Sequence, residues 1–292
     1  MPTAPRRTDD VLEGVFAAIA RDVHYRWVLS IVSTATLQYT AAAVTDRGRR
    51  RASNEDAFGY SVEDGVYVVC DGMGGAAGGE VASTLAVEEI LRLLAGFRET
   101  ALREEAGRSD ASHSGDVPSI VAEAVDAANT AIHSRAQRSL RLNGMGTTLV
   151  AVVVGEERLW VVNVGDSRCY QLRSRGLRAC TEDHSLIEEQ VRMGRMTRAE
   201  AARSPLRHII TRALGTQRQV TPDVFELKPE PGDMYLLCSD GLTRELADGE
   251  IERILRAEET LEERCAALVE AANRSGGQDN ITCVLIGVSE AA

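Results

Sequence analysis

The chain has 292 residues, of which 44% are hydrophobic and 26% charged, with a formal net charge of −11. These values are typical of a soluble globular protein, and the length fits one large α/β or α+β domain. The acidic balance argues against a nucleic-acid partner, because phosphate backbones are bound by basic surfaces. A substrate that carries phosphate would need metal ions to offset the negative field.

The start of the chain differs from the rest. Its apolar stretches are interrupted by Arg21, Asp22 and Arg26, so it lacks the continuous run of about 20 apolar residues that a membrane span needs. It also shows no clear signal-peptide cleavage pattern. We therefore expect an N-terminal extension at residues 1–35, with an amphipathic helix at residues 9–26, followed by one domain at residues 36–290.

The six cysteines show no CxxC spacing. Most of them lie in or next to apolar runs, which favours buried thiols over a disulfide framework or a zinc site. Unpaired thiols predict a reducing, cytoplasmic compartment.

From residue 36 onward the hydrophobic pattern predicts regular elements. In chain order these are strands at 37–44, 57–62 and 66–70, a helix at 80–94, a polar loop at 98–117, a helix at 118–140, and strands at 147–154, 159–164 and 169–172. The last three strands follow one another through short turns, which predicts an antiparallel meander.

The second half of the domain begins with a charged, partly helical segment at 183–205 that is suited to covering a site. It continues with strands at 208–213, 223–227 and 234–238, helices near 248–256 and 261–273, and a final strand at 281–288. Runs of strands separated by paired helices favour an α+β fold with antiparallel sheets over alternating βαβ units.

Four aspartates stand in glycine- or asparagine-containing turns: Asp56, Asp71, Asp240 and Asp279. Three of them adjoin strongly apolar, strand-like runs, so the fold can bring them together. Carboxylates gathered in this way repel one another unless cations lie between them. Because Gly72 leaves the backbone free to approach, its carbonyl can join the carboxylates as an oxygen ligand. The pattern predicts a site for hard divalent metal ions.

The same glycine-rich segment offers an alternative interpretation. Gly72-Met73-Gly74-Gly75-Ala76-Ala77 follows a predicted strand and fits the dinucleotide-binding pattern G-x-G-x-x-(G/A). Against this, Asp71 would point its charge at the pyrophosphate. In addition, no acidic residue ends a second parallel strand about 20 residues further on. The metal interpretation explains these residues better.

A set of motifs in fixed order extends over almost the whole domain, from about residue 37 to 288. They are Asp46-Arg47-Gly48, Arg51-Ala52-Ser53-Asn54-Glu55-Asp56, Asp71-Gly72-Met73-Gly74-Gly75, Gly79-Glu80-Val81-Ala82-Ser83, Met145-Gly146-Thr147-Thr148, Val164-Gly165-Asp166-Ser167-Arg168, Glu182-Asp183-His184-Ser185, Ile210-Thr211-Arg212-Ala213-Leu214-Gly215, Ser239-Asp240-Gly241-Leu242 and Gln278-Asp279-Asn280. On these motifs the chain resembles bacterial metal-dependent serine/threonine protein phosphatases of the type-2C class (PPM family).

The resemblance implies an α+β fold, a four-layer αββα sandwich of two central antiparallel sheets flanked by helix pairs. Residues 36–290 would be a phosphatase catalytic domain that hydrolyses phosphoserine and phosphothreonine in proteins through a metal-activated water at a binuclear Mn²⁺ or Mg²⁺ centre. The implied partners are phosphorylated proteins, namely serine/threonine kinases and their substrates, and we expect a monomer. The alternative is a non-catalytic phosphoprotein-binding regulatory module on the same fold, which arises when ligand aspartates are lost; here they are all present.

The resemblance also implies a set of metal ligands, which are Glu55 or Asp56, Asp71, the Gly72 carbonyl, Asp240 and Asp279. Asp71 would bridge the two ions, and Asp71 and Asp240 would be central to catalysis. Whether Glu55 or Asp56 touches metal directly stays open. All-oxygen ligation suits Mg²⁺ or Mn²⁺ better than zinc.

Arg51 matches the phosphate-binding arginine of the family, and a planar guanidinium can contact two phosphoryl oxygens at once. The alternative is a solvated loop arginine within the basic run 49–51. A third, weaker metal site of bacterial relatives would use Asp166 and an acidic residue four positions after Asp240. That position is Arg244 here, so we expect two functional ions.

Leaving-group protonation is the least defined step. Eukaryotic members often have a histidine where this chain has Met73, and a thioether cannot donate a proton. A metal-bound water could serve instead, and we interpret His184 and His208 as structural residues.

Overall fold

The computed structural model describes residues 32–33, 37–75, 77–97, 117–201, 203–206 and 208–291. The predicted helix at 9–26 and nearly all of the predicted loop at 98–117 lie outside these residues, as does most of the N-terminal extension.

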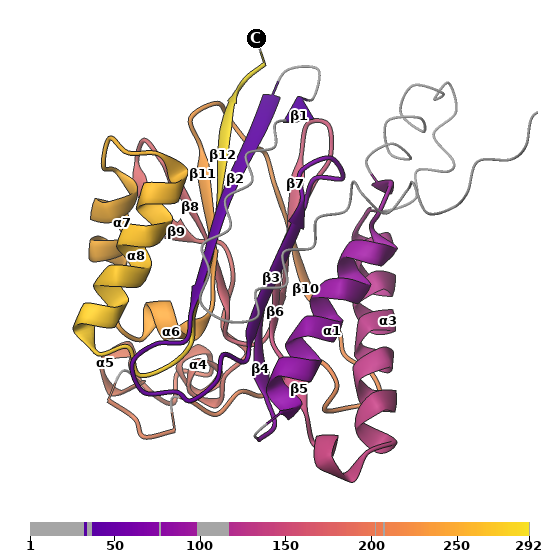
Figure 1. The fold of residues 1–292 in the computed structure, drawn as a ribbon. Coiled ribbons are helices and arrows are strands. Elements are labelled where there is room, and N and C mark those ends of the chain that lie inside the picture. The colour runs from indigo at the N-terminus through magenta and orange to yellow at the C-terminus, as the bar shows by residue number, and fades with distance from the viewer. Residues whose placement is uncertain are drawn as a thin grey trace, which may run out of the picture.

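Two antiparallel sheets form the centre of the molecule (Figure 1). The first contains, in spatial order, β1 (Val32–Ser33), β2 (Leu37–Asp46), β12 (Ile281–Glu290), β11 (Met234–Cys238), β8 (Arg168–Arg173) and β9 (Gly176–Ala179). The second contains β10 (Asp223–Leu227), β7 (Leu159–Val164), β6 (Leu149–Val154), β4 (Val66–Met73) and β3 (Asp56–Ser61), and β5 (Gly146–Thr147) pairs with β4.

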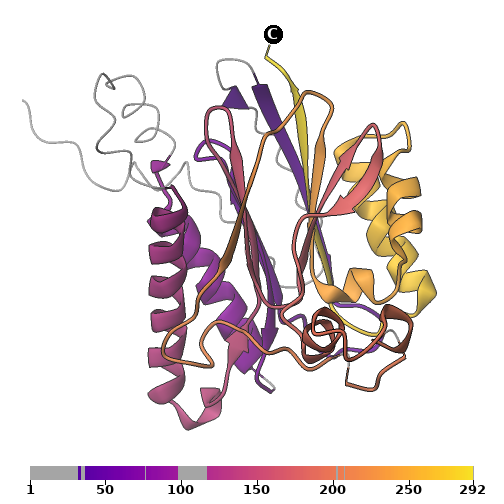
Figure 2. The same cartoon turned by 180° about the vertical axis from the view of Figure 1, so that it is seen from behind.

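Helices cover the outer face of each sheet, as the two opposite views show (Figures 1 and 2). The pair α1 (Gly78–Leu93) and α3 (Val117–Gln137) packs on the sheet that contains β4, and the pair α7 (Asp248–Leu255) and α8 (Leu261–Ser275) packs on the sheet that contains β12. Short elements complete the described chain: η2 (Leu140–Leu142), α4 (Leu186–Arg192), α5 (Arg198–Ala201) and α6 (Asp240–Thr243). The predicted four-layer αββα sandwich is confirmed.

The strands were readable as continuous apolar runs because both of their faces are buried. All six residues of β6 are buried. In an antiparallel sheet with one face in water, buried and exposed residues would alternate along the strand instead. One face of β6 meets the helix pair α1 and α3, and the other meets the opposite sheet. The dinucleotide interpretation is incompatible with this fold, because β4 is antiparallel to its neighbours β3 and β6.

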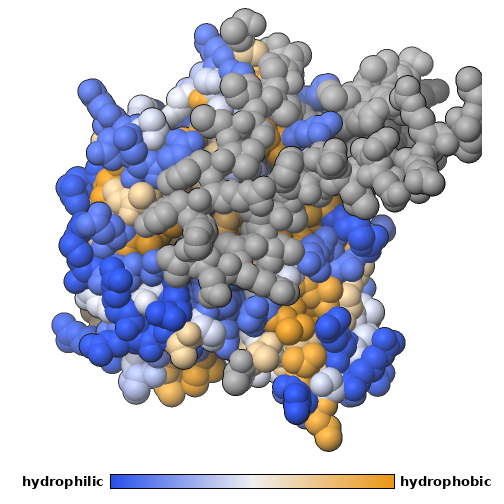
Figure 3. Space-filling model, in the orientation of Figure 1, coloured by the Kyte–Doolittle hydropathy of each residue, from blue (hydrophilic) through white to orange (hydrophobic). Residues whose placement is uncertain are grey.

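The helices are hydrophilic outside and apolar inside, as expected for helices that cover a sheet. Figure 3 shows mostly hydrophilic surface over α7 and α8, at the left of the view. Among the described residues, no helix is both long and apolar enough to cross a bilayer.

Two strand predictions were wrong. The expected meander is broken, because β6 and β7 pair with each other whereas β8 pairs with β11 in the opposite sheet. The chain changes sheets at Gly165, whose φ of 111° suits glycine, and this crossing brings Asp166 to the junction between the sheets. Local pattern does not reveal which sheet a strand will join.

The predicted strand at 208–213 is not formed. This segment makes only an isolated bridge between Ile210 and Ser185. Ile209 is 46% exposed, and Arg212 turns outward to pair with Asp223 at 2.7 Å. A short strand, β9, was not expected, since its residues are half-buried or exposed and carry no clear alternation.

Candidate metal and phosphate site

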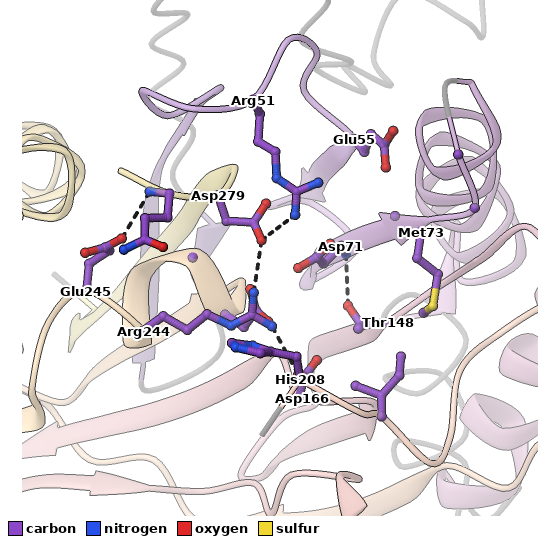
Figure 4. Close-up of a pocket in the computed structure, with 17 residues that line it drawn as sticks. Arg51, Glu55, Asp71, Met73, Thr148, Asp166, His208, Arg244, Glu245 and Asp279 are labelled. Carbon is purple, nitrogen blue, oxygen red and sulfur yellow. Dashed lines mark hydrogen bonds and ion pairs between the residues drawn. The ribbon is translucent and has the colours of Figure 1, made fainter. Parts of the chain in front are cut away.

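A pocket of about 640 Å³ opens at one end of the sandwich, where the ends of β4 and β11 meet the segment before β12. Its carboxylate side chains are Glu55, Asp71, Asp166, Asp240, Glu245 and Asp279. Arg51 and Arg244 also line it (Figure 4). The structure therefore gathers most of the residues predicted from sequence, from segments far apart in the chain. Asp56 does not line this pocket.

Asp71 is fixed through its backbone. Its N–H donates to the Thr148 hydroxyl at 2.9 Å, and its carbonyl accepts from the Thr148 N–H at 2.9 Å. Next to it, a Cβ on Gly72 would lie 2.1 Å from the carbonyl oxygen of Gly79 and 2.5 Å from that of Glu55. Only glycine permits this approach, which holds Asp71 and Glu55 beside the first turn of α1.

Asp240 and Asp279 are brought together by a similar close approach. A Cβ on Gly241 would lie 2.0 Å from the Asn280 carbonyl oxygen, so the turn that begins α6 rests directly on the segment before β12. Asp279 accepts from the Asn280 N–H at 2.9 Å through Oδ1, which leaves Oδ2 facing the pocket.

Asn280 joins the loop at 47–55 to the rest of the site. Its side-chain amide donates to the carbonyls of Arg47 at 3.0 Å and Ser53 at 2.9 Å, and its Oδ1 accepts from the Glu55 N–H at 2.8 Å. Sequence reasoning noted Asn280 only as part of a motif. An amide directly before a buried strand was the available signal, since such a residue can bond several backbone groups at once.

Asp56 lies behind the pocket, with 6% of its surface exposed. Its Oδ2 accepts from the hydroxyls of Ser239 and Thr282, each at 2.7 Å. Burial raises the pKa of Asp56 to about 6. Of the two neighbouring acids, Glu55 is therefore the one that faces the pocket, and Asp56 supports the turn that carries Asp240.

Burial and neighbouring negative charges disfavour the ionised forms of Asp71 and Asp166. Burial, together with the charges of Asp56 and Asp166, raises the pKa of Asp71 well above its usual range. Burial likewise raises the pKa of Asp166 to about 6, although Arg244 opposes the shift. Such shifts are typical of acidic sites that bind cations.

Two arginines supply positive charge to this pocket. Arg51 Nη2 lies 2.8 Å from Asp279 Oδ2, and Arg244 Nη1 lies 3.0 Å from the same oxygen. Arg244 also pairs with Asp240. Figure 4 shows the two guanidinium groups approaching Asp279 from opposite sides.

The donor atoms fit Mg²⁺ or Mn²⁺ in kind, because they are all oxygens. Asp240 Oδ1 is buried and has no hydrogen-bond partner, as expected of an atom that would face a cation. Within the described residues, no three His, Cys, Asp or Glu side chains converge as the ligands of one ion would. Arg51 and Arg244 instead lie among the carboxylates.

The other candidates from sequence are placed as follows. Met73 and His208 line the pocket. His184 does not; its Nδ1 accepts from the Gly165 N–H at 3.0 Å, and its Nε2 donates to Asp223 at 3.1 Å. Glu245 was not singled out from sequence, and it accepts from the Gln278 N–H at 3.0 Å.

The fold and the pocket define a class of protein, an αββα sandwich with an acidic, oxygen-lined site at one end of its sheets. Residues 45–285 match the family described as "Protein phosphatase 2C". The chain belongs to this family.

Known relatives agree with this assignment. The serine/threonine phosphatase stp of Listeria monocytogenes is 39% identical over 246 residues, which are 83% of this chain and 93% of the relative. The crystal structure of the Mycobacterium tuberculosis serine/threonine phosphatase PstP superposes with a TM-score of 0.75 at 37% identity, covering 87% of this chain and 99% of that one. The PstP catalytic domain in complex with two manganese ions gives a TM-score of 0.72 at 37% identity, with the same coverage. The prediction of a serine/threonine phosphatase is confirmed.

Proposed function

We propose that the protein removes phosphate from phosphoserine and phosphothreonine residues of other proteins, using two Mn²⁺ or Mg²⁺ ions held in the acidic pocket. The observation that carries this proposal is that Glu55, Asp71, Asp240 and Asp279 all line one pocket together with Arg51. A pocket with this negative charge would repel a phosphate group unless cations were bound in it.

The ligands of the two ions would be the carboxylates of Glu55, Asp71, Asp240 and Asp279 and the carbonyl of Gly72. Asp71 lies between Glu55 and Asp279 in the pocket (Figure 4) and would hold metal together with them. When bound, the ions would activate a water molecule for attack on phosphorus and offset the charge of the phosphoryl group.

Arg51 would bind the phosphoryl oxygens of the substrate. Its side chain is 50% exposed, so it can reach a substrate that enters from solvent. Its bond to Asp279 leaves other N–H groups of the guanidinium available, since the group has five donors in a planar fork. Met73, in contrast, has no proton to give to the leaving oxygen.

The expected substrates are phosphorylated proteins, among them serine/threonine kinases and their targets. A reducing, cytoplasmic setting is supported by the six cysteines, all of which are free thiols.

The test is hydrolysis of a phosphothreonine peptide by metal-free protein to which Mn²⁺ is added back. We expect turnover that depends on Mn²⁺ and is abolished in Asp71→Asn and Asp240→Asn. The matched control is Asp126→Asn, a surface residue of α3, which should retain full activity. Binding of the phosphopeptide without any turnover would contradict the proposal and favour a phosphoprotein-binding module.

A further inference from the structure

Arg244 places its guanidinium among the carboxylates of the proposed metal site. Its Nη1 lies 3.0 Å from Asp279 Oδ2, and its Nη2 pairs with Asp240 Oδ2. The same Nη2 lies 4.0 Å from Asp166 Oδ2. One side chain thus contacts acids from three separate segments, which are the crossing after β7, the start of α6 and the segment before β12.

The backbone of α6 fixes this position. Arg244 ends the helix that Asp240 begins, and its N–H donates to the Asp240 carbonyl at 2.8 Å. Residues four apart lie on the same face of a helix, with side chains inclined toward its N-terminus. The guanidinium is therefore directed at Asp240, and only 30% of the Arg244 side chain is exposed.

Arg244 brings positive charge directly beside these carboxylates, because its Nη1 lies 3.0 Å from Asp279 Oδ2. In this respect the guanidinium does what a bound cation would do. An ion placed between Asp240 and Asp279 would meet the guanidinium at Asp240 Oδ2 and Asp279 Oδ2.

We propose that Arg244 is an internal competitor of metal ions, because its guanidinium occupies the corner formed by Asp166, Asp240 and Asp279. It must release Asp240 and Asp279 before an ion can bind there. This inference rests on the proposed function, since it assumes that these two aspartates are metal ligands.

The structure offers a place for the displaced side chain. A second cavity of about 400 Å³ adjoins the site, and Asp166, Asp240 and Arg244 line both spaces. Asp183 and Glu188 also line the second cavity, but each already has an arginine partner. Arg168 holds Asp183 through two bonds of 2.8 and 2.7 Å, and Arg198 lies 3.1 Å from Glu188. Asp166 is therefore the acid toward which Arg244 turns when it leaves the metal ligands. In this arrangement Asp166 serves as the counter-ion of Arg244.

The experiment is calorimetric titration of metal-free protein with Mn²⁺, comparing wild type with Arg244→Met. We expect Arg244→Met to bind Mn²⁺ at least about tenfold more tightly, since an ion no longer has to break charge-assisted hydrogen bonds. The matched control is Arg253→Met. It removes the same charge from an exposed position on α7, where the side chain is 70% exposed, and should bind Mn²⁺ as wild type does.

A second measurement needs no titration. Metal-free Arg244→Met should melt at a lower temperature than wild type, because its carboxylates lose their internal cation, and saturating Mn²⁺ should remove this difference. Should Arg244→Met fail to fold, Arg244→Lys retains the charge with fewer directed donors and should bind Mn²⁺ with intermediate affinity.

The outcomes separate the two proposals. Equal Mn²⁺ affinity in wild type, Arg244→Met and Arg244→Lys overturns the role of Arg244 and leaves the proposed function standing. Absence of Mn²⁺ binding in every variant overturns both.

Discussion

Two arginines meet the same carboxylate oxygen, Asp279 Oδ2, from opposite sides of the pocket, and their surroundings differ. Arg51 comes from the loop before β3 and is 50% exposed, whereas Arg244 comes from the end of α6 and is 30% exposed. Among the residues that the structure describes, Arg51 makes one ion pair, while Arg244 lies within 4.0 Å of three aspartates.

This difference shows that two residues of the same type, both arginines, can have different roles within one pocket. A half-exposed arginine on the rim remains free to exchange its protein partner for a substrate anion. An arginine surrounded by acids instead acts as an internal cation and opposes the binding of other cations. Arg51 should accordingly govern substrate turnover, and Arg244 should govern metal affinity.

The largest expected effect separates these roles. Arg51→Ala should lower kcat/KM for a phosphothreonine peptide by about a hundredfold or more, since charge-assisted contacts to the phosphoryl group are lost. Its Mn²⁺ affinity should change by less than about threefold, because a half-exposed ion pair is weak.

Arg50→Ala is the matched control for Arg51, because it is the exposed neighbour in the same basic run. Steady-state kinetics and calorimetry on both variants give the comparison. An unchanged kcat/KM in Arg51→Ala would leave Arg51 as an ordinary solvated loop residue.

The next effect tests what holds Arg51 in place. Asn280→Ala removes three hydrogen bonds to the loop at 47–55 and should lower the free energy of unfolding by about 2–4 kcal/mol. Asn143→Ala, at an exposed position after η2, should stay within about 0.5 kcal/mol of wild type. Both values come from urea denaturation; a similarly small loss for Asn280→Ala would show that the loop is held by other contacts.

The sequence predicted the bounds of three strands. Strands β7, β10 and β11 have the bounds that were expected from sequence. The change of sheet between β7 and β8 was not predictable, because residues buried on both faces look alike in either sheet. The segment at 208–213 looked like a strand because of its two isoleucines, yet its backbone makes one isolated bridge and Arg212 bonds through its side chain to Asp223.

The site, too, was predictable from the sequence only in part. Its aspartate candidates were recognisable because they stand in turns and three of them adjoin apolar, strand-like runs, and the family motifs implied the rest of the ligand set. The contacts of Arg244 and Asn280 were not recognisable, since they depend on which segments the fold brings together. Sequence marked Arg244 only as a departure from the expected acid, and the structure shows it paired with Asp240 and Asp279.

A smaller effect concerns the number of ions. Because Arg244 stands where the family resemblance implies an acidic ligand of a third site, we expect Mn²⁺ titration of wild type to saturate at two ions. Arg244→Asp restores an acid beside Asp166 and should add a third, weaker binding event. A third ion bound by wild type and lost in Asp166→Asn would contradict this expectation.

The smallest expected effect is a change in how stability depends on pH, and it concerns His184, on the side of the pocket that holds Asp166. His184 accepts from the Gly165 N–H through Nδ1, and this bond fixes the turn that carries Asp166. Burial lowers the pKa of His184 in the folded state, so the unfolded chain takes up the proton first as the pH falls. The stability from this histidine is therefore complete above about pH 6.5, the usual histidine pKa, and declines below it.

Removing the imidazole should make unfolding less dependent on pH in that range. Between pH 7.5 and pH 5.5, metal-free His184→Gln should lose less stability than wild type does, measured by urea denaturation at each pH. His133→Gln serves as the control. The His133 ring bonds the Gly215 carbonyl through Nδ1 at 3.0 Å, away from the turn that carries Asp166. Parallel losses in wild type and His184→Gln would mean that the turn at Asp166 does not depend on a neutral imidazole.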